Sequence, residues 1–219
     1  MSAAIASIIG ATGMIGRELV RQLIDNDHYE TIRILVRRPM ESPHPKVKVK
    51  LVDFSDAESI KLAMDGSEVL FCAIGTTQKK VKGDRQAYTK IDFDIPVRAA
   101  RACREIGCRK IVVITSVGAN SKSSNFYLKL KGHVEDAISL EPFASIHFFQ
   151  PSLLLGKREE RRPVEKISMG LMKVFAPLLI GGLRKYRPVT DQQLAAAMIR
   201  AALSPSVGVQ RHLYDQIVE

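Results

Sequence analysis

A glycine-rich turn near the start of the chain constrains its fold more than any other feature. The segment IIGATGMIGREL, residues 8–19, carries Gly10, Gly13 and Gly16 between an apolar run, Ala4–Ile9, and an amphipathic pattern typical of a helix. The first glycine can take a positive φ and reverse the chain. The second leaves the backbone open to a ligand, and the third lets the helix lie close to the strand.

A helix that begins directly after such a turn can bind an anion, because its N-terminus offers unpaired N–H groups and a partial positive charge. The order of strand, glycine turn and helix therefore predicts a site for the diphosphate of a dinucleotide. A tight turn that binds nothing is the alternative. The other residues predicted to contact the dinucleotide here are Thr12, Met14 and Ile15.

Apolar runs alternate with helical patterns along most of the chain. The predicted strands are Ala4–Ile9, Thr31–Val36, Val47–Val52, Val69–Ala73, Lys110–Thr115 and Ser145–Gln150. The predicted helices lie near Met14–Ile24, Ala57–Met64, Asp84–Ile106, Phe126–Leu140 and Asp191–Leu203. This alternation predicts an α/β fold, a doubly wound parallel sheet with helices on both faces. The 219 residues are expected to form one domain, residues 1–219, with a small C-terminal lobe.

The alternation loosens after Gln150, and residues 156–190 are predicted to form loops or a lid on the substrate side of the site. Within them, the mixed-charge stretch Lys157–Lys166 predicts an exposed loop, and Ile167–Ile180 predicts a core or lid helix. The second stretch is too short for a membrane span and contains a lysine and a proline. No basic and apolar leader precedes the first predicted strand, so we expect neither a secretory signal nor a membrane partner.

Three cysteines and a positive charge limit the function classes. Cys72, Cys103 and Cys108 lack disulfide-framework and metal-ligand spacing, which predicts reduced thiols, a cytoplasmic location and no metal. The net charge of +10 suits anionic cofactors and small-molecule substrates. No nucleic-acid partner is expected, because the chain lacks tryptophan and any basic stripe interleaved with aromatic residues. The alternating lysines of Lys46–Leu51 predict one solvated strand face, and composition leaves the oligomeric state open.

The residues after the second predicted strand favour NADP(H) over NAD(H). Sites for NAD place an acidic residue about 20 positions after the glycines, where it binds the ribose hydroxyls. This chain has Arg37 and Arg38 there, and no acidic residue before Glu41. An arginine fork can hold a 2′-phosphate that a carboxylate would repel, although a basic surface turn is the alternative. Asp53 could bind the adenine amino group or close a helix-capping turn, and Phe54 beside it is assigned to the cofactor site.

Two further strand ends are predicted to line the cofactor site. The segment FCAIGTT, residues 71–77, contains small residues that let the backbone approach a ribose. Its predicted cofactor contacts are Ala73, Ile74 and Gly75. The segment QPSLLLG, residues 150–156, ends the sixth predicted strand, where Pro151 and Leu153 are predicted to flank the nicotinamide. Each segment could equally be an unoccupied strand end.

A serine, a tyrosine and a lysine are the candidate catalytic residues. Ser116 ends the fifth predicted strand, and Tyr127 and Lys131 follow at positions i and i+4, which share one face of a helix. A tyrosine is normally too weak an acid for proton transfer at neutral pH, but a nearby ammonium stabilises its phenolate. Tyr127 could then exchange a proton with a carbonyl or alcohol oxygen that Ser116 also binds, while hydride moves to or from the nicotinamide. His133 and His147 are interpreted as a surface helix position and a strand position.

Several of these segments together resemble an atypical short-chain dehydrogenase/reductase, and more narrowly the Tat-interacting protein family of NADPH-binding proteins. They are GATGMIG, LVRRP, VDF (residues 52–54), FCAIGTT, SSNFYLKLKG (residues 123–132) and QPSLLLG. The resemblance covers most of the chain and is weakest after Gly156. It implies a Rossmann-type fold, NADPH held by the glycine turn and the paired arginines, and the serine, tyrosine and lysine at catalytic positions. Ala73-Ile74-Gly75 replaces the NAG-type turn of ordinary short-chain dehydrogenases.

Three functions follow from these observations. The first is an NADP(H)-dependent oxidoreductase that acts on a small carbonyl or alcohol. The second is an NADPH-binding redox sensor or scaffold without turnover, which need not keep the three catalytic residues. The third is a sugar-nucleotide epimerase, which has a similar fold and similar catalytic residues. Epimerases usually carry a larger C-terminal substrate domain than the residues after Gln150 provide.

Overall fold

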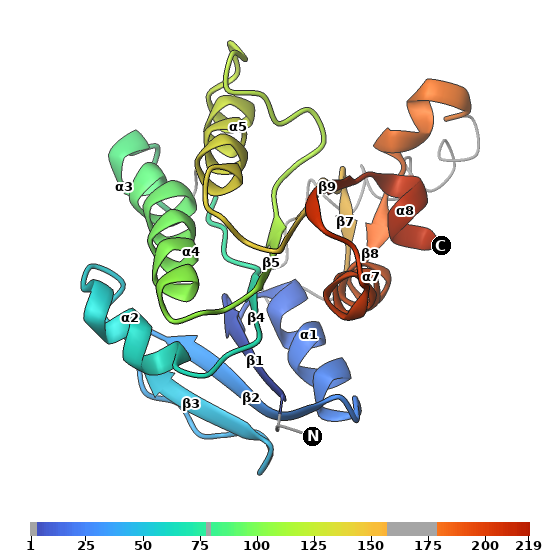
Figure 1. Cartoon of the computed structure of the whole chain (residues 1–219). Coiled ribbons are helices and arrows are strands. Elements are labelled where there is room, and N and C mark those ends of the chain that lie inside the picture. The colour runs from blue at the N-terminus through green and yellow to red at the C-terminus, as the bar shows by residue number, and fades with distance from the viewer. Residues whose placement is uncertain (1–3, 78–79, 157–178) are drawn as a thin grey trace.

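A parallel sheet of seven strands forms the centre of the computed structural model, which describes residues 4–77, 80–156 and 179–219 (Figure 1). The strands lie in the order β3-β2-β1-β4-β5-β6-β9, and every neighbouring pair is parallel. Their bounds are β1 Ala4–Ile9, β2 Tyr29–Val36, β3 Val47–Leu51, β4 Val69–Cys72, β5 Lys110–Ile114, β6 Ser145–Phe149 and β9 Gly208–His212. The predicted doubly wound parallel sheet is confirmed. The edge strand β9 was not predicted.

Helices cover both faces of this sheet. On one face, α1 (Met14–Ile24) packs against α7 (Asp191–Leu203) (Figure 1). The helices of the other face are α2 (Ala57–Met64), α4 (Ile95–Glu105) and α5 (Phe126–Ser139). Strand order reverses between β1 and β4, and in such sheets ligands bind at the carboxyl ends of the strands beside the reversal.

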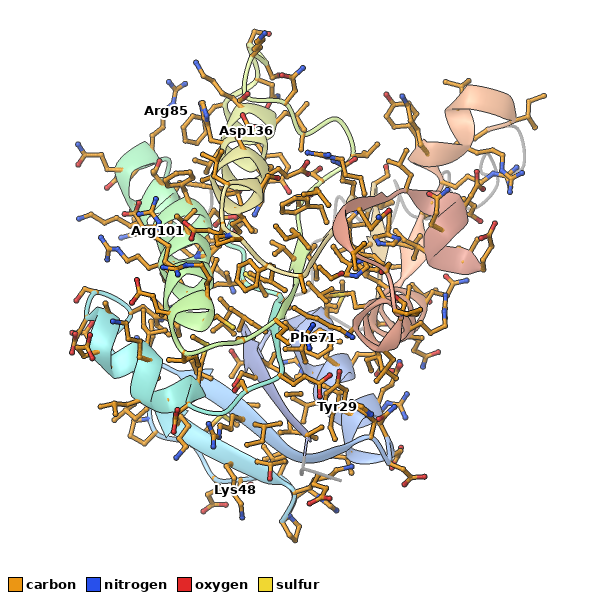
Figure 2. All side chains as sticks on the ribbon, viewed as in Figure 1. Tyr29, Lys48, Phe71, Arg85, Arg101 and Asp136 are labelled. Atoms are coloured by element: carbon orange, nitrogen blue, oxygen red, sulfur yellow. The ribbon has the colours of Figure 1, made fainter. Side chains whose placement is uncertain are left out.

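Strand residues alternate between two apolar cores, because successive side chains point to opposite faces of a sheet. Ile8 and Phe71 belong to the core under α1 and α7, whereas Ile9 and Cys72 belong to the core under α2 and α4. Tyr29, at the start of β2, is fully buried in the first core, and its ring lies edge-on to the Phe71 ring at 6.5 Å between centroids (Figure 2).

The lysines around β3 do not all belong to one solvated face. Lys48 is exposed and projects outward (Figure 2). Lys46, just before β3, instead donates hydrogen bonds from Nζ to the carbonyl oxygens of Leu23, Ile24 and Asn26 at 3.1, 2.9 and 2.5 Å. A cation at this end of α1 satisfies carbonyl groups that the helix leaves unpaired. The prediction of a single solvated face is therefore wrong for Lys46.

The helix predicted over Asp84–Ile106 contains a wider turn in its middle. It consists of α3 (Arg85–Thr89), the π-helical turn η1 (Lys90–Asp94) and α4. Pro96, in the first turn of α4, has no N–H to donate to the carbonyl of Asp92 four residues earlier, and a proline ring also crowds that carbonyl. This gives the wider turn a local cause, and single π-helical turns of this kind are frequent at functional sites.

A short second sheet and two short helices belong to the described part of the C-terminal lobe. β7 (Leu154–Leu155) pairs in parallel with β8 (Val189–Thr190). The helices are the 3-10 helix η3 (Gly181–Tyr186) and α8 (Tyr214–Val218). The loop predicted over Lys157–Lys166 lies outside the described residues, as does all but the end of the helix predicted over Ile167–Ile180. Within the described ranges, no helix has the length and apolar character that a membrane span needs.

Candidate functional site

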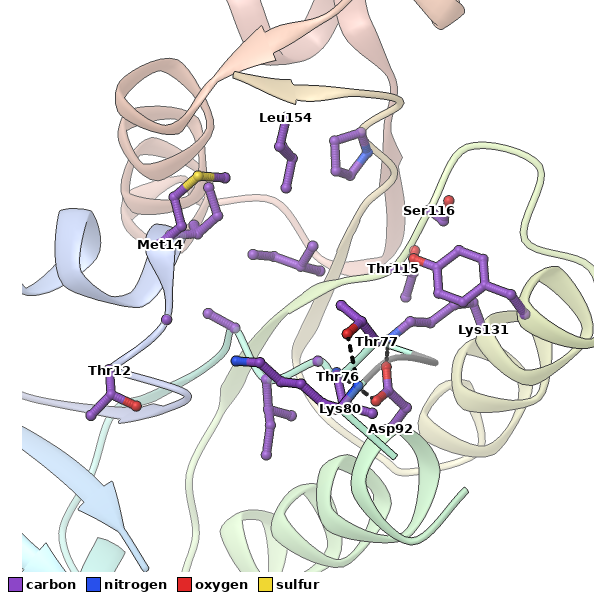
Figure 3. Close-up of a pocket in the computed structure, with 18 of the residues that line it drawn as sticks. Thr12, Met14, Thr76, Thr77, Lys80, Asp92, Thr115, Ser116, Lys131 and Leu154 are labelled. Carbon is purple, nitrogen blue, oxygen red and sulfur yellow. Dashed lines mark hydrogen bonds and ion pairs between the residues drawn. The ribbon is translucent and has the colours of Figure 1, made fainter. Parts of the chain in front are cut away.

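Two adjoining hollows lie at the carboxyl ends of the central strands. We call the first the tyrosine hollow, because Tyr127 lines it, and its volume is about 340 Å³ (Figure 3). We call the second the arginine hollow, because Arg37 and Arg38 line it, and its volume is about 490 Å³. The residues that line both are Thr12, Gly13, Ala73, Ile74, Gly75, Thr76 and Lys80. The glycine turn and the end of β4 therefore join the hollows into one groove.

The glycine turn has the close packing that its spacing predicts. Gly10 has φ +84°, and a Cβ atom there would stand 2.5 Å from the carbonyl oxygen of Ala73. A Cβ on Gly16 would overlap the backbone of Gly10, so this glycine lets α1 begin against β1. Gly13 is the N-cap of α1, and no side chain caps that end. The first N–H groups of α1 can therefore bind an anion in the groove.

Other residues predicted for the cofactor lie along the same groove. Met14 and Ile15 line the tyrosine hollow, and Gly10 and Phe54 line the arginine hollow. Gly16 is buried and lines neither hollow, so its part is to shape the turn. Pro151 lines the tyrosine hollow as well.

Two residues predicted for the cofactor lie apart from the groove. Leu153 lines neither hollow; its neighbours Ser152 and Leu154 do, and its own carbonyl accepts a hydrogen bond from the N–H of Val189. The pairing of β7 with β8 holds this segment so that Ser152 and Leu154 line the tyrosine hollow and Leu153 does not. Asp53 accepts hydrogen bonds from the hydroxyl and the N–H of Ser55 at 2.6 and 2.8 Å, and these bonds hold the pKa of its carboxyl below the usual value. The turn interpretation of Asp53 is the one that its contacts support.

The three candidate catalytic residues line the tyrosine hollow together. Ser116 follows β5, and its hydroxyl makes only a long bond, 3.4 Å, to the carbonyl of Val117 among the described residues (Figure 3). Tyr127 and Lys131 lie one turn apart on α5, which Asn125 caps by accepting from the N–H of Tyr127. The Lys131 ammonium nitrogen lies 5.9 Å from the centroid of the Tyr127 ring.

Lys131 has a buried partner that was not predicted. Its Nζ donates a hydrogen bond of 2.8 Å to Oδ1 of Asp92 in η1, and both side chains are at most 5% exposed (Figure 3). Burial, the largest single effect, would lower the pKa of the Lys131 ammonium, but Asp92 together with Tyr127 and Cys72 outweighs burial and raises that pKa above its usual value. Lys131 is therefore a fixed cation beside Tyr127. Pro96, four positions after Asp92, marks the wider turn in the sequence, but no local pattern indicates Lys131 as the partner of Asp92.

A buried carboxylate one turn beyond Lys131 holds the strand ends that carry Ser116 and Pro151. Glu135 Oε1 accepts hydrogen bonds from Thr115 Oγ1 and from Gln150 Nε2, each at 2.7 Å. Its Oε2 accepts a hydrogen bond of 2.8 Å from Arg211 Nε of β9. The positions of the β5 and β6 ends relative to α5 thus depend on β9, the strand that the sequence analysis did not predict.

Two cations of the groove were also missed. Lys80 lines both hollows and extends into the groove (Figure 3). Arg17, on α1, lines the tyrosine hollow and donates from Nη1 to the carbonyl oxygen of Thr12 at 2.9 Å. With Arg37 and Arg38, these side chains give the groove a basic character that suits phosphate groups. Within the described ranges, no group of three histidine, cysteine, aspartate or glutamate residues could hold a metal ion.

The two histidines lie where they were interpreted. His133 is an exposed position of α5, and His147 is buried in β6. His147 hydrogen-bonds to Ser145 of its own strand and to His212 of β9. In the sheet, β9 lies on the opposite side of β6 from β4, whose end lines the groove. Neither histidine lines the tyrosine or the arginine hollow.

Comparisons with known proteins agree with this geometry. A family model described as NAD(P)H-binding matches residues 10–139. Protein HTATIP2 of Rattus norvegicus is 28% identical over 215 residues, which is 96% of this chain and 86% of the relative. Protein FMP52, mitochondrial, of Debaryomyces hansenii is 31% identical over 206 residues, 91% of this chain and 88% of the relative. A UDP-N-acetylglucosamine 4-epimerase structure from Methanobrevibacter ruminantium has a TM-score of 0.71 at 16% identity, with 97% of this chain and 77% of that chain covered.

Proposed function

The chain belongs to the NAD(P)H-binding family, and on that premise we propose that it is an NADP(H)-dependent oxidoreductase that acts on a small carbonyl or alcohol. One observation carries the proposal. Ser116, Tyr127 and Lys131 line the same hollow as the glycine turn, so a proton donor and a dinucleotide would meet there. A small-molecule substrate, rather than nucleic acid or a membrane, is the proposed partner.

The residues of the groove fit the proposed cofactor. Side chains are absent where a diphosphate would approach, because Gly13 carries no Cβ and the first N–H groups of α1 have no side-chain cap. Arg37 and Arg38 are exposed at the end of the arginine hollow and would hold a 2′-phosphate. Ala73 to Gly75 would lie along the sugar and nicotinamide.

The nicotinamide would supply or accept the hydride, and this chain would supply the proton. In the reducing direction, Tyr127 gives its phenolic proton to the carbonyl oxygen of the substrate as that oxygen gains negative charge. The Ser116 hydroxyl donates a hydrogen bond to the same oxygen. Lys131, kept charged by Asp92, stabilises the phenolate that forms.

Replacement of Tyr127 by phenylalanine tests the proposal. A screen of aldehydes, ketones and sugar-derived carbonyls, with NADPH consumption as the measured signal, would identify a substrate. We expect Tyr127→Phe to lower the turnover rate by about 10²–10⁴, the usual contribution of a general acid, with little change in NADPH affinity. Tyr214→Phe removes the same hydroxyl in α8, outside both hollows, and should leave the rate unchanged.

Other outcomes of this screen favour other functions. Turnover of a substrate at the wild-type rate by the phenylalanine variant would exclude Tyr127 as the proton donor. NADPH binding without turnover of any carbonyl would favour the redox sensor or scaffold. Recovery of tightly bound NAD with the purified protein would favour an epimerase.

A cytoplasmic location is part of the proposal. The three cysteines are free and buried, which suits a reducing compartment. The FMP52 relatives are named as mitochondrial proteins, so a mitochondrial location is the competing outcome. Imaging of the tagged protein beside mitochondrial and cytosolic markers decides between the two.

A further inference from the structure

Two side chains one turn apart on the α3–η1 segment hydrogen-bond to the backbone of one residue, Thr76, in the loop after β4. Asp92 Oδ2 accepts a hydrogen bond of 2.8 Å from the N–H of Thr76. The hydroxyl of Tyr88 donates a hydrogen bond of 3.1 Å to the carbonyl oxygen of Thr76. Thr76 lines both hollows and follows the small residues of the β4 end. Both polar groups of one groove-lining residue are therefore held by α3–η1.

The same two side chains also contact the two candidate catalytic residues of α5. Asp92 Oδ1 binds the ammonium of Lys131 at 2.8 Å, so each carboxylate oxygen has its own partner. The Tyr88 ring lies edge-on to the Tyr127 ring, with 6.4 Å between centroids. Tyr88 and Asp92 are 5% and 1% exposed, so water does not compete for these bonds.

A buried ion pair of this kind is seldom favourable for stability alone. Removing two charges from water costs free energy that their attraction repays only with good geometry and further hydrogen bonds. An apolar pair would serve packing equally well, and the wider π-helical turn at Pro96 also gives up regular helical bonds. These features suggest a use for the charges in the site.

We propose that Tyr88 and Asp92 form a positioning pair that joins the backbone of Thr76, on the cofactor side, to Tyr127 and Lys131. This inference rests on the proposed function and deepens it. Neither residue exchanges a proton with substrate. Tyr88 orders only the loop, whereas Asp92 orders the loop and also keeps Lys131 charged. The charged or titratable groups that face Lys131 are Asp92 from η1, Tyr127 from its own helix and Cys72 from β4.

Paired variants separate the two parts of this proposal. Tyr88→Phe keeps the ring and removes one hydrogen bond to Thr76, so NADPH should bind about three- to tenfold more weakly. Asp92→Asn should weaken NADPH binding to a similar extent. It should also lower the pKa of Lys131, because burial is then no longer opposed by a carboxylate. NMR of lysine labelled at Cε and Nζ, with Lys131→Arg to assign the signal, measures this titration without any substrate.

The result expected is a Lys131 titration that moves to lower pH in Asp92→Asn and stays at the wild-type position in Tyr88→Phe. An unchanged Lys131 titration in Asp92→Asn would overturn the proposal, and so would wild-type NADPH affinity in both variants. If Asp92→Asn does not fold, the double variant Asp92→Asn with Lys131→Met removes both charges. Recovery of folding in the double variant supports the pairing, whereas a second failure to fold gives Asp92 a purely structural role and overturns the proposal.

Failure of the proposed function gives a different pattern. A protein that binds NADPH but reduces no carbonyl would still show both affinity losses and the shifted Lys131 titration. A wild-type protein that binds no NADPH would contradict the proposed function, while the Lys131 titration would still test the role of Asp92.

Discussion

At the scale of single residues, we propose that Arg37 and Arg38 decide which dinucleotide the groove prefers. Both are exposed and line the arginine hollow, where a 2′-phosphate would lie. We expect NADPH to bind about ten- to a hundredfold more tightly than NADH, from one charge-assisted contact of about 1.5–3 kcal/mol. The double variant Arg37→Ser with Arg38→Ser should lose this preference, mainly through weaker NADPH binding. Isothermal titration calorimetry with both cofactors measures the difference.

Arg109→Ser is the control for charge. Arg109 is exposed directly before β5, at the opposite end of the strand from the groove. Its loss lowers the net charge without touching the arginine hollow, so the ratio of the two affinities should not change. Equal affinities for NADPH and NADH in the wild-type protein would exclude the paired arginines as the 2′-phosphate site.

Side chains that contact the backbone nearby were easier to predict than side chains that meet across elements. Thr12, Gly13 and Gly75 line the groove because each lies at a strand end that its sequence marks. The Asp92–Lys131 pair joins residues 39 positions apart in sequence, and no local pattern specifies that contact. The pairing of β7 with β8, beside Leu153, is another contact that no local pattern specifies.

A pair of histidines between β6 and β9 sets the acid sensitivity of the sheet edge. Nδ1 of His147 lies 2.9 Å from Nε2 of His212, and Nε2 of His147 lies 2.7 Å from the hydroxyl of Ser145. Burial, with smaller contributions from His212 and Lys110, lowers the pKa of His147 to about 4, and burial also lowers the pKa of His212. Both imidazoles are therefore neutral in the folded protein near neutral pH.

The free energy of unfolding should decrease as the pH falls from about 6.5 towards about 4. The unfolded chain binds a proton at His147 with an ordinary pKa of about 6.5, whereas the folded chain binds it only near pH 4, so protons favour unfolding between these values. The full loss is about 3 kcal/mol for His147. Urea denaturation at several pH values measures it.

His147→Gln can keep hydrogen bonds but cannot titrate, so the free energy of unfolding should depend less on pH between about 7 and 5. His133→Gln removes an exposed histidine from α5 and should leave that dependence as in the wild type. If the free energy of unfolding falls equally with pH in His147→Gln and in the wild type, the histidine pair does not cause the acid sensitivity.

At the scale of elements, we propose that the glycine turn is where the cofactor binds. Gly13 has φ −77°, which any residue can adopt, and a Cβ there would stand 3.2 Å from the carbonyl oxygen of Gly10. We expect Gly13→Val to fold but to bind NADPH at least about tenfold more weakly, because the branched side chain occupies the place of the diphosphate. Gly182→Val adds the same group where no atom lies within 4 Å, outside both hollows. Calorimetry that finds wild-type affinity in Gly13→Val would show that the phosphates bind elsewhere.

The helices and the buried strands were predicted because their local sequence patterns are strong. Elements with weak local patterns were not predicted. Runs such as Val69–Cys72 are apolar throughout because both faces of that strand are covered. β9 has the sequence GVQRH and is mostly exposed, so only its pairing with β6 makes it a strand. The wider turn between α3 and α4 arises from the effect of Pro96 on a carbonyl one turn earlier. Hydrophobic periodicity does not detect such an effect, so the sequence analysis predicted one continuous helix.

At the scale of the whole molecule, the groove crosses the middle of the sheet. Residues after β1, β2, β3, β4, β5 and β6 line it, so a bound dinucleotide would lie across the ends of six of the seven strands of the large sheet. Because those strands belong to both apolar cores, loss of the folded sheet would also destroy the groove. Cofactor binding and folding are therefore linked, and a ligand that binds only the folded state stabilises it.

NADPH should raise the unfolding temperature of the whole chain. At a concentration 100 times its dissociation constant, a ligand adds about 2.7 kcal/mol to the free energy of unfolding. A chain of this size then unfolds roughly 5–10 °C higher, by the usual relation between stability and melting temperature. At the same concentration, NADH should raise the unfolding temperature of the wild-type protein less than NADPH does. In the variant that lacks Arg37 and Arg38, the two cofactors should give equal rises. Differential scanning calorimetry that finds the same large NADPH shift in Gly13→Val would contradict this link, because that variant closes the place where the diphosphate would bind.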